Sequence, residues 1–242
     1  MDVQRITYRR PCHLKCHSGD LKLDLFAATE NFAFQEPLGP GAILLRKFCQ
    51  QEERAKANAA ALLRDLAALL EISPLRHMVT PGGFEMSVAM SNCGALGWVT
   101  DQAGYRYQAV DPKTGSPWPR MPLSFLELAK RAAQVGGFED FVPDACLINR
   151  YEVGSRLTLH QDKNEIDFLQ PIVSVSLGLP AVFLFGGLER TSPTRKVQLT
   201  HGDVAVWGGS SRLNYHGILP LKDGLHELTG PCRYNLTFRK AG

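Results

Sequence analysis

Long apolar runs are missing from this chain of 242 residues. The best candidate for a membrane span, residues 172–185, contains Ser, Gly and Pro and has the patterning of two strands. The N-terminus also lacks the apolar run that is typical of a secretory signal. We therefore expect a cytoplasmic protein that does not insert into a membrane.

Cysteine is scarce and irregularly placed. The six cysteines show no framework spacing, which argues against a disulfide-stapled fold and predicts free thiols in a reducing compartment. The segment CHLKCH, residues 12–17, offers four potential metal ligands, but its spacing matches no standard zinc site. We favour a disordered tail as the interpretation of this segment.

Net charge is small and unevenly distributed. Five Lys or Arg and two Asp lie within residues 1–22, so this segment carries the whole formal charge of +3 and the remainder is neutral. Any binding to nucleic acid would therefore depend on a local patch rather than on a global field. We predict that residues 1–24 form a disordered basic extension with a weak, salt-sensitive attraction to phosphate.

Two segments have the periodicity and composition of helices. Residues 50–71 are rich in Ala and Leu and end at Ser73 and Pro74. A second helix is predicted over residues 122–135, with Ser124 and the glutamate three positions later at capping-box spacing and a glycine pair as its stop. Both helices are expected to pack on a sheet as supports.

Short strand patterns fill most of the rest of the chain. Between the two helices they are FEMSVAMSN, GWVT and YRYQAV. After residue 144 they are CLINRY, LTLHQD, IVSVSLG, AVFLFGG, KVQLT, DVAVWGG and YNLTFR. Many short strands separated by Gly and Pro turns favour a β-sandwich or a jelly roll.

Three residues, His160, Asp162 and His216, have the pattern of a metal site. The first two lie in RLTLHQD, whose alternation predicts a strand with both side chains on one face. Two imidazoles and one carboxylate can bind one face of iron(II) and leave other positions open for a co-substrate and oxygen. His-x-Asp pairs also arise by chance, and a histidine in a strand is more often structural, so the pattern alone leaves both possibilities open.

The C-terminal segment RYNLTFR, residues 233–239, places two arginines on one face of a strand. With period 2, Arg233, Asn235, Thr237 and Arg239 share that face, and apolar or aromatic residues occupy the other. Buried guanidinium groups are costly unless they are paired. The face is therefore either solvated, or it is an interior face that binds an anion with two separated carboxylates.

Six segments carry a longer pattern: MVTPGGFEMSVAMSNCGALGW, GYRYQAVDP, ACLINRY, HQDKNEIDFLQPIVSVSLGLPAVFLFGGLER, HGDVAVWGGSSRLNYHGI and CRYNLTFR. Together they resemble the AlkB family of iron(II)- and 2-oxoglutarate-dependent dioxygenases, from about residue 25 to the C-terminus. The resemblance implies a mainly β (α+β) fold. Its jelly-roll core, a double-stranded β-helix, would occupy residues 144–242, and supporting helices with an N-terminal nucleotide-recognition lid would occupy residues 25–143.

The resemblance also implies the roles of individual residues toward iron(II), 2-oxoglutarate and O2. The metal ligands would be His160, Asp162 and His216. The distal carboxylate of 2-oxoglutarate would be bound by Arg233 with help from Asn149 and Tyr151, which alternate on one strand. Arg239 and Asn235 would lie near the carboxylate that is proximal to the metal. A structural ion pair is the alternative for the two arginines.

Substrate contacts are implied for seven further residues: Trp98, Tyr105, Thr80, Met90, Lys163, Asn164 and Arg190. Aromatic faces such as Trp98 and Tyr105 stack on bases, although the two rings could instead form a small core within the lid. Met90 could line the pocket or simply pack, and the polar members could be solvated surface residues.

One departure from the family concerns substrate choice. The best-known members read HQDKD, whereas this chain reads HQDKN. Asn164 thus replaces an acidic residue that faces the target base in the family. A neutral amide can accept or donate a hydrogen bond but loses the attraction for a positive charge. We predict a relaxed base preference, or weaker discrimination in favour of cationic bases.

The implied function is oxidative demethylation of N-alkylated bases, such as 1-methyladenine and 3-methylcytosine, in single-stranded DNA or RNA. Formaldehyde and succinate are the expected products, and the process would reverse alkylation damage directly. The motifs do not distinguish DNA from RNA. The alternatives are a 2-oxoglutarate-dependent hydroxylase of a substrate other than nucleic acid, and a nucleic-acid-binding module without catalysis. Nothing in the sequence requires more than a monomer.

Overall fold

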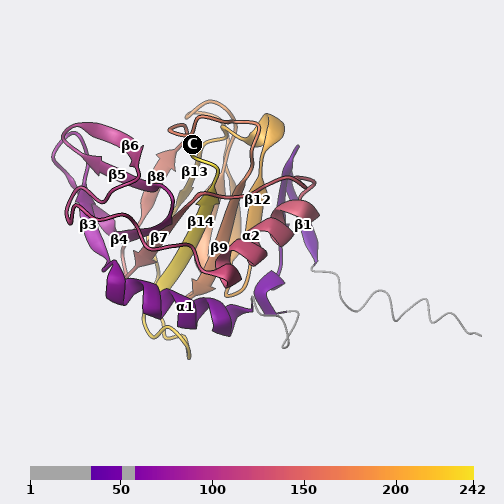
Figure 1. Ribbon diagram of the computed structural model, residues 1–242. Coiled ribbons are helices and arrows are strands. Elements are labelled where there is room, and N and C mark those ends of the chain that lie inside the picture. Colours follow the sequence, from indigo (N-terminus) through magenta and orange to yellow (C-terminus); the bar gives the residue numbers. More distant parts are fainter. Residues whose placement is uncertain (1–33, 51–57) are drawn as a thin grey trace, which may run out of the picture. The chain divides into compact units, whose positions relative to one another are not determined.

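The computed structural model describes residues 34–50 and 58–242 and consists mainly of β-strands (Figure 1). The strands in chain order are β1 (Gln35–Gly39), β2 (Ala42–Leu45), β3 (Arg76–Val79), β4 (Glu85–Gly94), β5 (Gly97–Asp101), β6 (Gly104–Gln108), β7 (Ala145–Tyr151), β8 (Leu157–His160), β9 (Ile172–Gly178), β10 (Ala181–Phe185), β11 (Arg195–Leu199), β12 (Val204–Trp207), β13 (His216–Ile218) and β14 (Arg233–Arg239). The helices are α1 (Ala59–Ile72) and α2 (Leu123–Val135), with 3-10 turns η1 (Phe48–Gln50) and η2 (Gly209–Ser211). The predicted basic extension and its CHLKCH segment lie outside the described residues.

The strands form two large antiparallel sheets and one hairpin. The larger sheet has the order β1-β2-β12-β9-β14-β7-β4-β3, and the smaller one has the order β11-β10-β13-β8. Strands β5 and β6 pair only with each other among the described residues. Two antiparallel sheets with long crossovers between them form a jelly roll, so the predicted fold class is confirmed. The larger sheet takes strands from both sides of the predicted boundary at residue 144.

Helix α1 begins later than its sequence pattern predicts. Residue 50 belongs to the 3-10 turn η1, and residues 51–57 lie outside the described part of the chain. The N-cap is Asn58, whose side-chain oxygen accepts a hydrogen bond from the amide of Ala61 at 2.9 Å. Such a cap satisfies an amide that has no partner within the helix. The predicted end is confirmed, because Ser73 is the C-cap.

Helix α2 has the predicted end but not the predicted capping box. Its N-cap is Pro122, which makes no side-chain cap hydrogen bond. The hydroxyl of Ser124 instead donates to the carboxylate of Asp65 on α1 and so links the two helices. Gly136 is the C-cap, and the next residue, Gly137, has a φ of 85°, which favours glycine.

One face of the larger sheet is covered by the two helices (Figure 1). Buried residues from α1 and α2 form one cluster with inward-facing residues of β7, β9, β12 and β14. The opposite face of the sheet meets the smaller sheet, and there the buried apolar residues include Phe183, Phe185 and Trp207. The alternation of β14 matches this layering, because Leu236 and Phe238 lie in the helix-covered cluster.

The described helices and cysteines bear on two predictions, which concern membrane spans and disulfide bonds. Neither α1 nor α2 is long and apolar enough to cross a membrane. The four cysteines that are described, Cys49, Cys93, Cys146 and Cys232, are free thiols, as predicted. The other two lie in the segment outside the described residues.

A pair of leucines on α2 offers a test of this core. Leu128 is fully buried, whereas Leu123 is 73% exposed. We expect Leu128→Ala to lower the free energy of unfolding by about 3 kcal/mol, because it leaves a cavity between helix and sheet. The same change at Leu123 should cost less than about 0.5 kcal/mol. Urea denaturation of both variants would measure this, and equal losses would contradict the proposed packing.

Candidate metal centre

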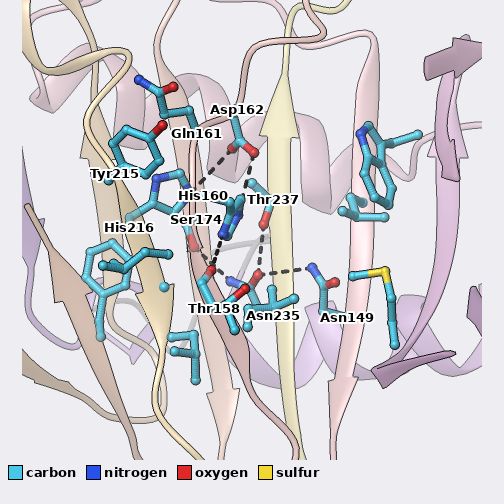
Figure 2. Close-up of a pocket in the computed structure, with 18 of the residues that line it drawn as sticks. Asn149, Thr158, His160, Gln161, Asp162, Ser174, Tyr215, His216, Asn235 and Thr237 are labelled. Atoms are coloured by element: carbon cyan, nitrogen blue, oxygen red, sulfur yellow. Dashed lines mark hydrogen bonds and ion pairs between the residues drawn. The ribbon is translucent and has the colours of Figure 1, made fainter. Parts of the chain in front are cut away.

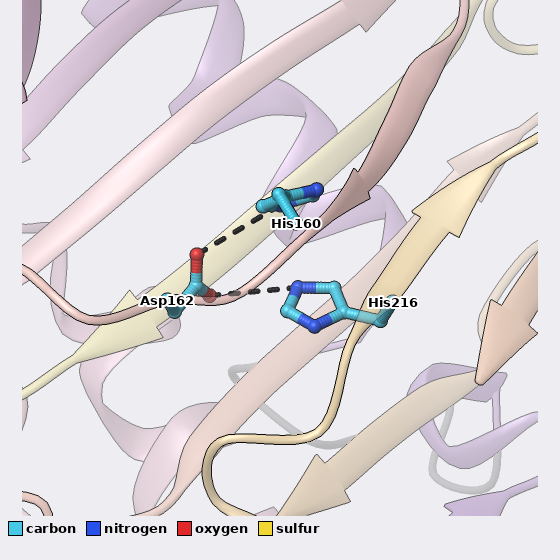
Figure 3. A group of neighbouring side chains, drawn as sticks. All are labelled: His160, Asp162 and His216. Carbon is cyan, nitrogen blue, oxygen red and sulfur yellow. Dashed lines mark ion pairs between the residues drawn. The ribbon is translucent and has the colours of Figure 1, made fainter. Parts of the chain in front are cut away.

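Three potential ligand atoms converge where β8 meets β13 (Figure 3). The carboxylate of Asp162 lies between two imidazoles, with Oδ1 3.8 Å from Nε2 of His160 and Oδ2 3.7 Å from Nε2 of His216. The ligand atoms lie within 4.8 Å of one another, and no other group of three or more His, Cys, Asp or Glu in the described residues is so placed. The predicted pattern is thus assembled in three dimensions.

Backbone hydrogen bonds fix the orientation of both imidazoles. Nδ1 of His160 lies 2.8 Å from the carbonyl oxygen of Thr158, and Nδ1 of His216 lies 3.0 Å from that of Asn214. A carbonyl oxygen can only accept, so each Nδ1 carries a hydrogen and each Nε2 of the neutral ring has a free lone pair. Second-sphere partners of this kind orient metal-binding histidines in proteins.

Protonation also favours a cation at this position. Burial, and then the neighbouring His160, lower the pKa of His216 to about 4, so its ring is neutral at neutral pH. Burial alone would raise the pKa of Asp162, but Arg239 and the two histidines lower it overall. The neutral imidazole of His216 and the carboxylate of Asp162 therefore face one another without a proton between them, and Nε2 of His160 lies beside the same carboxylate. This donor set fits a divalent metal ion such as iron(II).

Asp162 is positioned by tertiary contacts rather than by a strand. The prediction that the strand continues to Asp162 is wrong, because β8 ends at His160. From β14, Arg239 donates to Oδ2 of Asp162 through Nη2 at 2.7 Å and Nε at 3.1 Å. From the loop before β13, Arg212 donates to the backbone carbonyl of Asp162 at 2.8 Å. Arg239 thus holds the carboxylate and Arg212 the backbone of Asp162, in a segment without ladder hydrogen bonds.

A second buried carboxylate completes this network. One oxygen of Glu165 accepts a hydrogen bond from the hydroxyl of Tyr107 at 2.7 Å and lies 3.4 Å from Arg239. The other oxygen accepts from Arg212 at 3.1 Å. Burial alone would lower the pKa of Arg239, but Asp162, Tyr107 and Glu165 raise it overall. The network ties the metal-facing carboxylate to the β5–β6 hairpin.

Close approach of β13 to β8 brings the two histidines together. In the strand register His216 is opposite His160, and their ring centroids are 4.4 Å apart. A side chain at Gly217 would begin 2.8 Å from the carbonyl oxygen of Leu157. Since real Cβ atoms do not approach backbone so closely, glycine at this position permits the pairing.

The metal-facing atoms open into a cavity of about 430 Å³. This volume is in the range of small-molecule sites. All fifteen residues singled out from the sequence line its wall. They are His160, Asp162, His216, Asn149, Tyr151, Arg233, Asn235, Arg239, Trp98, Tyr105, Thr80, Met90, Lys163, Asn164 and Arg190. The fold thus brings side chains that are far apart in the sequence to one cavity.

One wall of the cavity is a polar strip on the larger sheet (Figure 2). The side-chain amide of Asn235 donates to the hydroxyl of Ser174 at 2.8 Å, and its oxygen accepts from Thr237 at 2.8 Å and from Asn149 at 3.3 Å. These bonds fix the orientation of Asn235. The oxygen of Asn149 has no partner among the described residues and is available to a ligand or to water.

Arg233 is a buried cation whose hydrogen-bonding capacity is largely unused. It is 1% exposed, donates through Nη2 to Ser176 at 3.0 Å and lies 4.8 Å from the ring centre of Tyr151. Its Nε and Nη1 have no partner in the described part of the chain. Burial lowers the pKa of Arg233, and Tyr151 opposes this effect. A buried guanidinium without an anion is costly, so the residues fit a ligand that brings a carboxylate, such as 2-oxoglutarate.

The two arginines of β14 have different surroundings. The alternative of a structural ion pair describes Arg239, which is bonded to Asp162, but not Arg233. No carboxylate lies within ion-pair distance of Arg233 in the described residues. Both arginines lie on the same face of the strand that the sequence predicts. Only their neighbours in the folded chain show that one is paired with a carboxylate and the other is not.

Another part of the cavity wall is aromatic. The rings of Trp98 and Tyr105 stack with centroids 5.7 Å apart and an angle of 21° between planes. Tyr105 is 47% exposed and Trp98 is half-buried, so the pair presents aromatic surface to the cavity rather than forming a closed core. At the rim, Arg190 lies over the ring of Tyr215 and donates to the carbonyl oxygen of Leu159.

Several contributors to the site were not predicted from the sequence. Ser174 and Ser176 alternate with valines in IVSVSLG, and this alternation is a sequence signal for a strand with a polar face. Tyr107, Glu165 and Arg212 had none, since their partners are 47 to 58 positions away in the sequence.

Proteins of known identity resemble this chain over most of its length. A sequence profile described as 2OG-Fe(II) oxygenase superfamily matches residues 41–239. The alpha-ketoglutarate-dependent dioxygenase AlkB of Escherichia coli (strain K12) is 59% identical over 220 residues, which cover 91% of this chain and 98% of that protein. The nucleic acid dioxygenase ALKBH1 of Homo sapiens is 35% identical over 133 residues, or 53% of this chain and 34% of the human protein. The structure of OsALKBH1 matches with a TM-score of 0.72 at 31% identity and covers 85% of this chain and 99% of that one.

Replacement of the carboxylate tests the metal centre. We expect Asp162→Asn to weaken iron(II) binding by more than about 100-fold, since even changes to second-sphere partners cost about 10–100-fold. Calorimetric titration with iron(II) under nitrogen would measure this. Asp167→Asn is a matched control, because Asp167 lies in the same loop but only accepts from the backbone amide of Leu169. Equal affinities of the two variants would contradict the assignment.

Proposed function

Because the chain belongs to the AlkB family of 2OG-Fe(II) oxygenases, it is an iron(II)- and 2-oxoglutarate-dependent dioxygenase, and we propose that it demethylates N-alkylated bases in single-stranded DNA or RNA. The substrates include bases of the 1-methyladenine and 3-methylcytosine type, and the products are the restored base, formaldehyde and succinate. The nucleic acid dioxygenase among its relatives supports nucleic acid as the substrate class.

A single observation carries this proposal: one cavity joins the metal-facing triad to a stacked aromatic pair. The triad supplies a place for oxidation, and Trp98 and Tyr105 supply a flat surface on which a base can stack. A base inside a duplex cannot reach an enclosed site, so it has to be flipped out or already single-stranded. N-methylation of the pairing edge weakens pairing and so lowers the cost of extrusion.

The metal and the co-substrate have separate sets of residues in this proposal. His160, Asp162 and His216 hold the iron. Arg233 would bind the distal carboxylate of 2-oxoglutarate through its two unpaired nitrogens, Nε and Nη1, beside Tyr151 and the Asn149–Asn235 strip. Arg239 orients Asp162 and would lie near the carboxylate of the co-substrate that is proximal to the metal.

Bound iron and 2-oxoglutarate, with O2, supply the oxidising chemistry that turns an N-methyl group into one that leaves as formaldehyde. The protein contributes geometry. The Nδ1–H bonds to backbone carbonyls keep the two histidines facing the metal. Arg239 and Arg212 hold Asp162 in place, and the aromatic wall holds the base over the same cavity. Fixing the reacting groups in this way removes much of the entropic cost of bringing them together.

The rim residues complete the proposed substrate site. Lys163 and Arg190 are exposed cations that would contact the phosphate backbone. Thr80 and Met90 also line the cavity, where they would limit the size of the base. Direct reversal of alkylation damage in the cytoplasm by a monomer is the biological setting that we propose. The free state of the described cysteines supports a reducing compartment.

Mass spectrometry of methylated oligonucleotides tests the proposed function. A single-stranded oligonucleotide with one 1-methyladenine, and another with one 3-methylcytosine, would be incubated with protein, iron(II), 2-oxoglutarate, ascorbate and air. We expect each to lose the mass of one methylene group with the wild type and to remain unchanged with His160→Ala. Succinate without loss of methyl from any base would indicate a substrate other than nucleic acid. Absence of succinate would indicate a protein that only binds.

Arg233 provides a separate test of co-substrate binding. We expect Arg233→Lys to raise the Kd for 2-oxoglutarate at least about tenfold, because lysine keeps the charge but loses the side-by-side N–H donors of the planar guanidinium group. Iron(II) binding should not change. Arg195→Lys is the matched control, because Arg195 pairs with Glu36 at the surface. Calorimetry of iron-loaded protein under nitrogen would report both, and unchanged 2-oxoglutarate affinity would contradict the role of Arg233.

A further inference from the structure

Asn164 is held in one orientation by a side chain from the aromatic wall. The indole N–H of Trp98 donates to Oδ1 of Asn164 at 3.2 Å, and both residues line the cavity. Indole nitrogen is a donor only, so it has to face the amide oxygen and not the amide nitrogen. The bond therefore determines which end of the amide is engaged by the protein.

The free end of the Asn164 amide is its donor end. Nδ2 of Asn164 has no hydrogen-bond partner among residues 34–50 and 58–242, and the residue is exposed. Asn164 follows Asp162 by two positions and is bonded to the ring of Trp98. Its two free N–H groups thus belong to a side chain that lies beside the ring of Trp98, on which a base would stack.

The charged side chains around the cavity do not favour a cationic base. Asp162 is the one carboxylate among the described residues that line it, and this group faces the metal site and pairs with Arg239. Four cationic side chains line the same cavity: Lys163, Arg190, Arg233 and Arg239. A positively charged base would therefore find repulsion and no free anion, whereas a neutral base carries no such penalty.

Methylated bases fall into two chemical classes at their pairing edge. Methylation of adenine at N1 or cytosine at N3 gives a cation with an amino donor at C6 of the purine or C4 of the pyrimidine. Methylation of guanine at N1 or thymine at N3 gives a neutral base with a carbonyl acceptor at the same position. A fixed N–H donor complements the second class and faces donor against donor in the first.

We propose that the Trp98–Asn164 pair makes this enzyme favour neutral N-methylated bases with a carbonyl next to the methylated nitrogen, such as 1-methylguanine and 3-methylthymine. Cationic 1-methyladenine and 3-methylcytosine are the poorer substrates. This selectivity rests on the proposed demethylase function and specifies the substrate class of the same site.

The test compares kcat/KM for four single-stranded oligonucleotides of identical sequence, each with one of these four methylated bases. For the wild type we expect the neutral bases to give the higher values. Asn164→Asp replaces the donor by a charged acceptor, so the ratio of neutral to cationic substrates should fall at least about tenfold, the effect of one hydrogen bond to a charged group. Asn164 is exposed, so this change should not impair folding.

Two further variants separate orientation from charge. Trp98→Phe keeps an aromatic ring but removes the N–H, so the amide can turn and the ratio should move toward one. Asn58→Asp makes the same change of charge at the N-cap of α1, where Asp caps as well as Asn, and should leave the ratio unchanged.

The outcomes distinguish this inference from the function on which it rests. A wild type that prefers the cationic bases, or an Asn164→Asp variant with an unchanged ratio, would overturn the inference while demethylation stands. Succinate formation without loss of methyl from any of the four bases would overturn the proposed function, and the inference with it.

Discussion

The ion pair between Arg239 and Asp162 is the interaction on which the metal centre depends. Asp162 lies beyond the end of β8, so no ladder hydrogen bond fixes its backbone. Arg239 is anchored in β14, which pairs with strands on both sides along most of its length. Removal of one partner from a buried pair costs roughly 3–5 kcal/mol, because the other charge is left without compensation. Glu165 and Arg212 extend the pair to two anions and two cations.

The two faces of the larger sheet have different roles: one packs against the helices, and the other lines the cavity. Strand β14 shows this division within seven residues, because Leu236 and Phe238 pack against the helices while Asn235 and Thr237 face the cavity. Side chains alternate between faces with period 2, so one strand can serve both purposes. The helices cover the apolar face, and the smaller sheet leaves a cavity over the polar one.

The cavity contains buried polar atoms without hydrogen-bond partners, and these atoms lower the stability of the folded chain. The unpaired N–H groups of Arg233 and the free oxygen of Asn149 are buried without partners among the described residues. Each such group opposes folding by about 1–3 kcal/mol, and more if charged. A ligand that satisfies them finds donors already in place and does not have to order them. The same principle applies to Asn164, whose orientation Trp98 fixes before a base arrives.

Local patterns in the sequence determined the elements and their inward faces, and tertiary contacts decided how the site is held. The alternation of residues 233–239 predicted a strand with its polar side chains on one face, because side-chain direction follows from backbone geometry alone. Whether that face is solvated or interior was left open, and the fold places it in the cavity. The hydroxyl of Ser124 was predicted to cap α2 but bonds Asp65, a partner that no local pattern reveals. The segment at Asp162 was predicted as strand, yet Arg239 and Arg212 position it. Spacing along the chain determines which side chains share a face of a strand. Charge pairing between distant segments depends on distances that exist only in the folded chain.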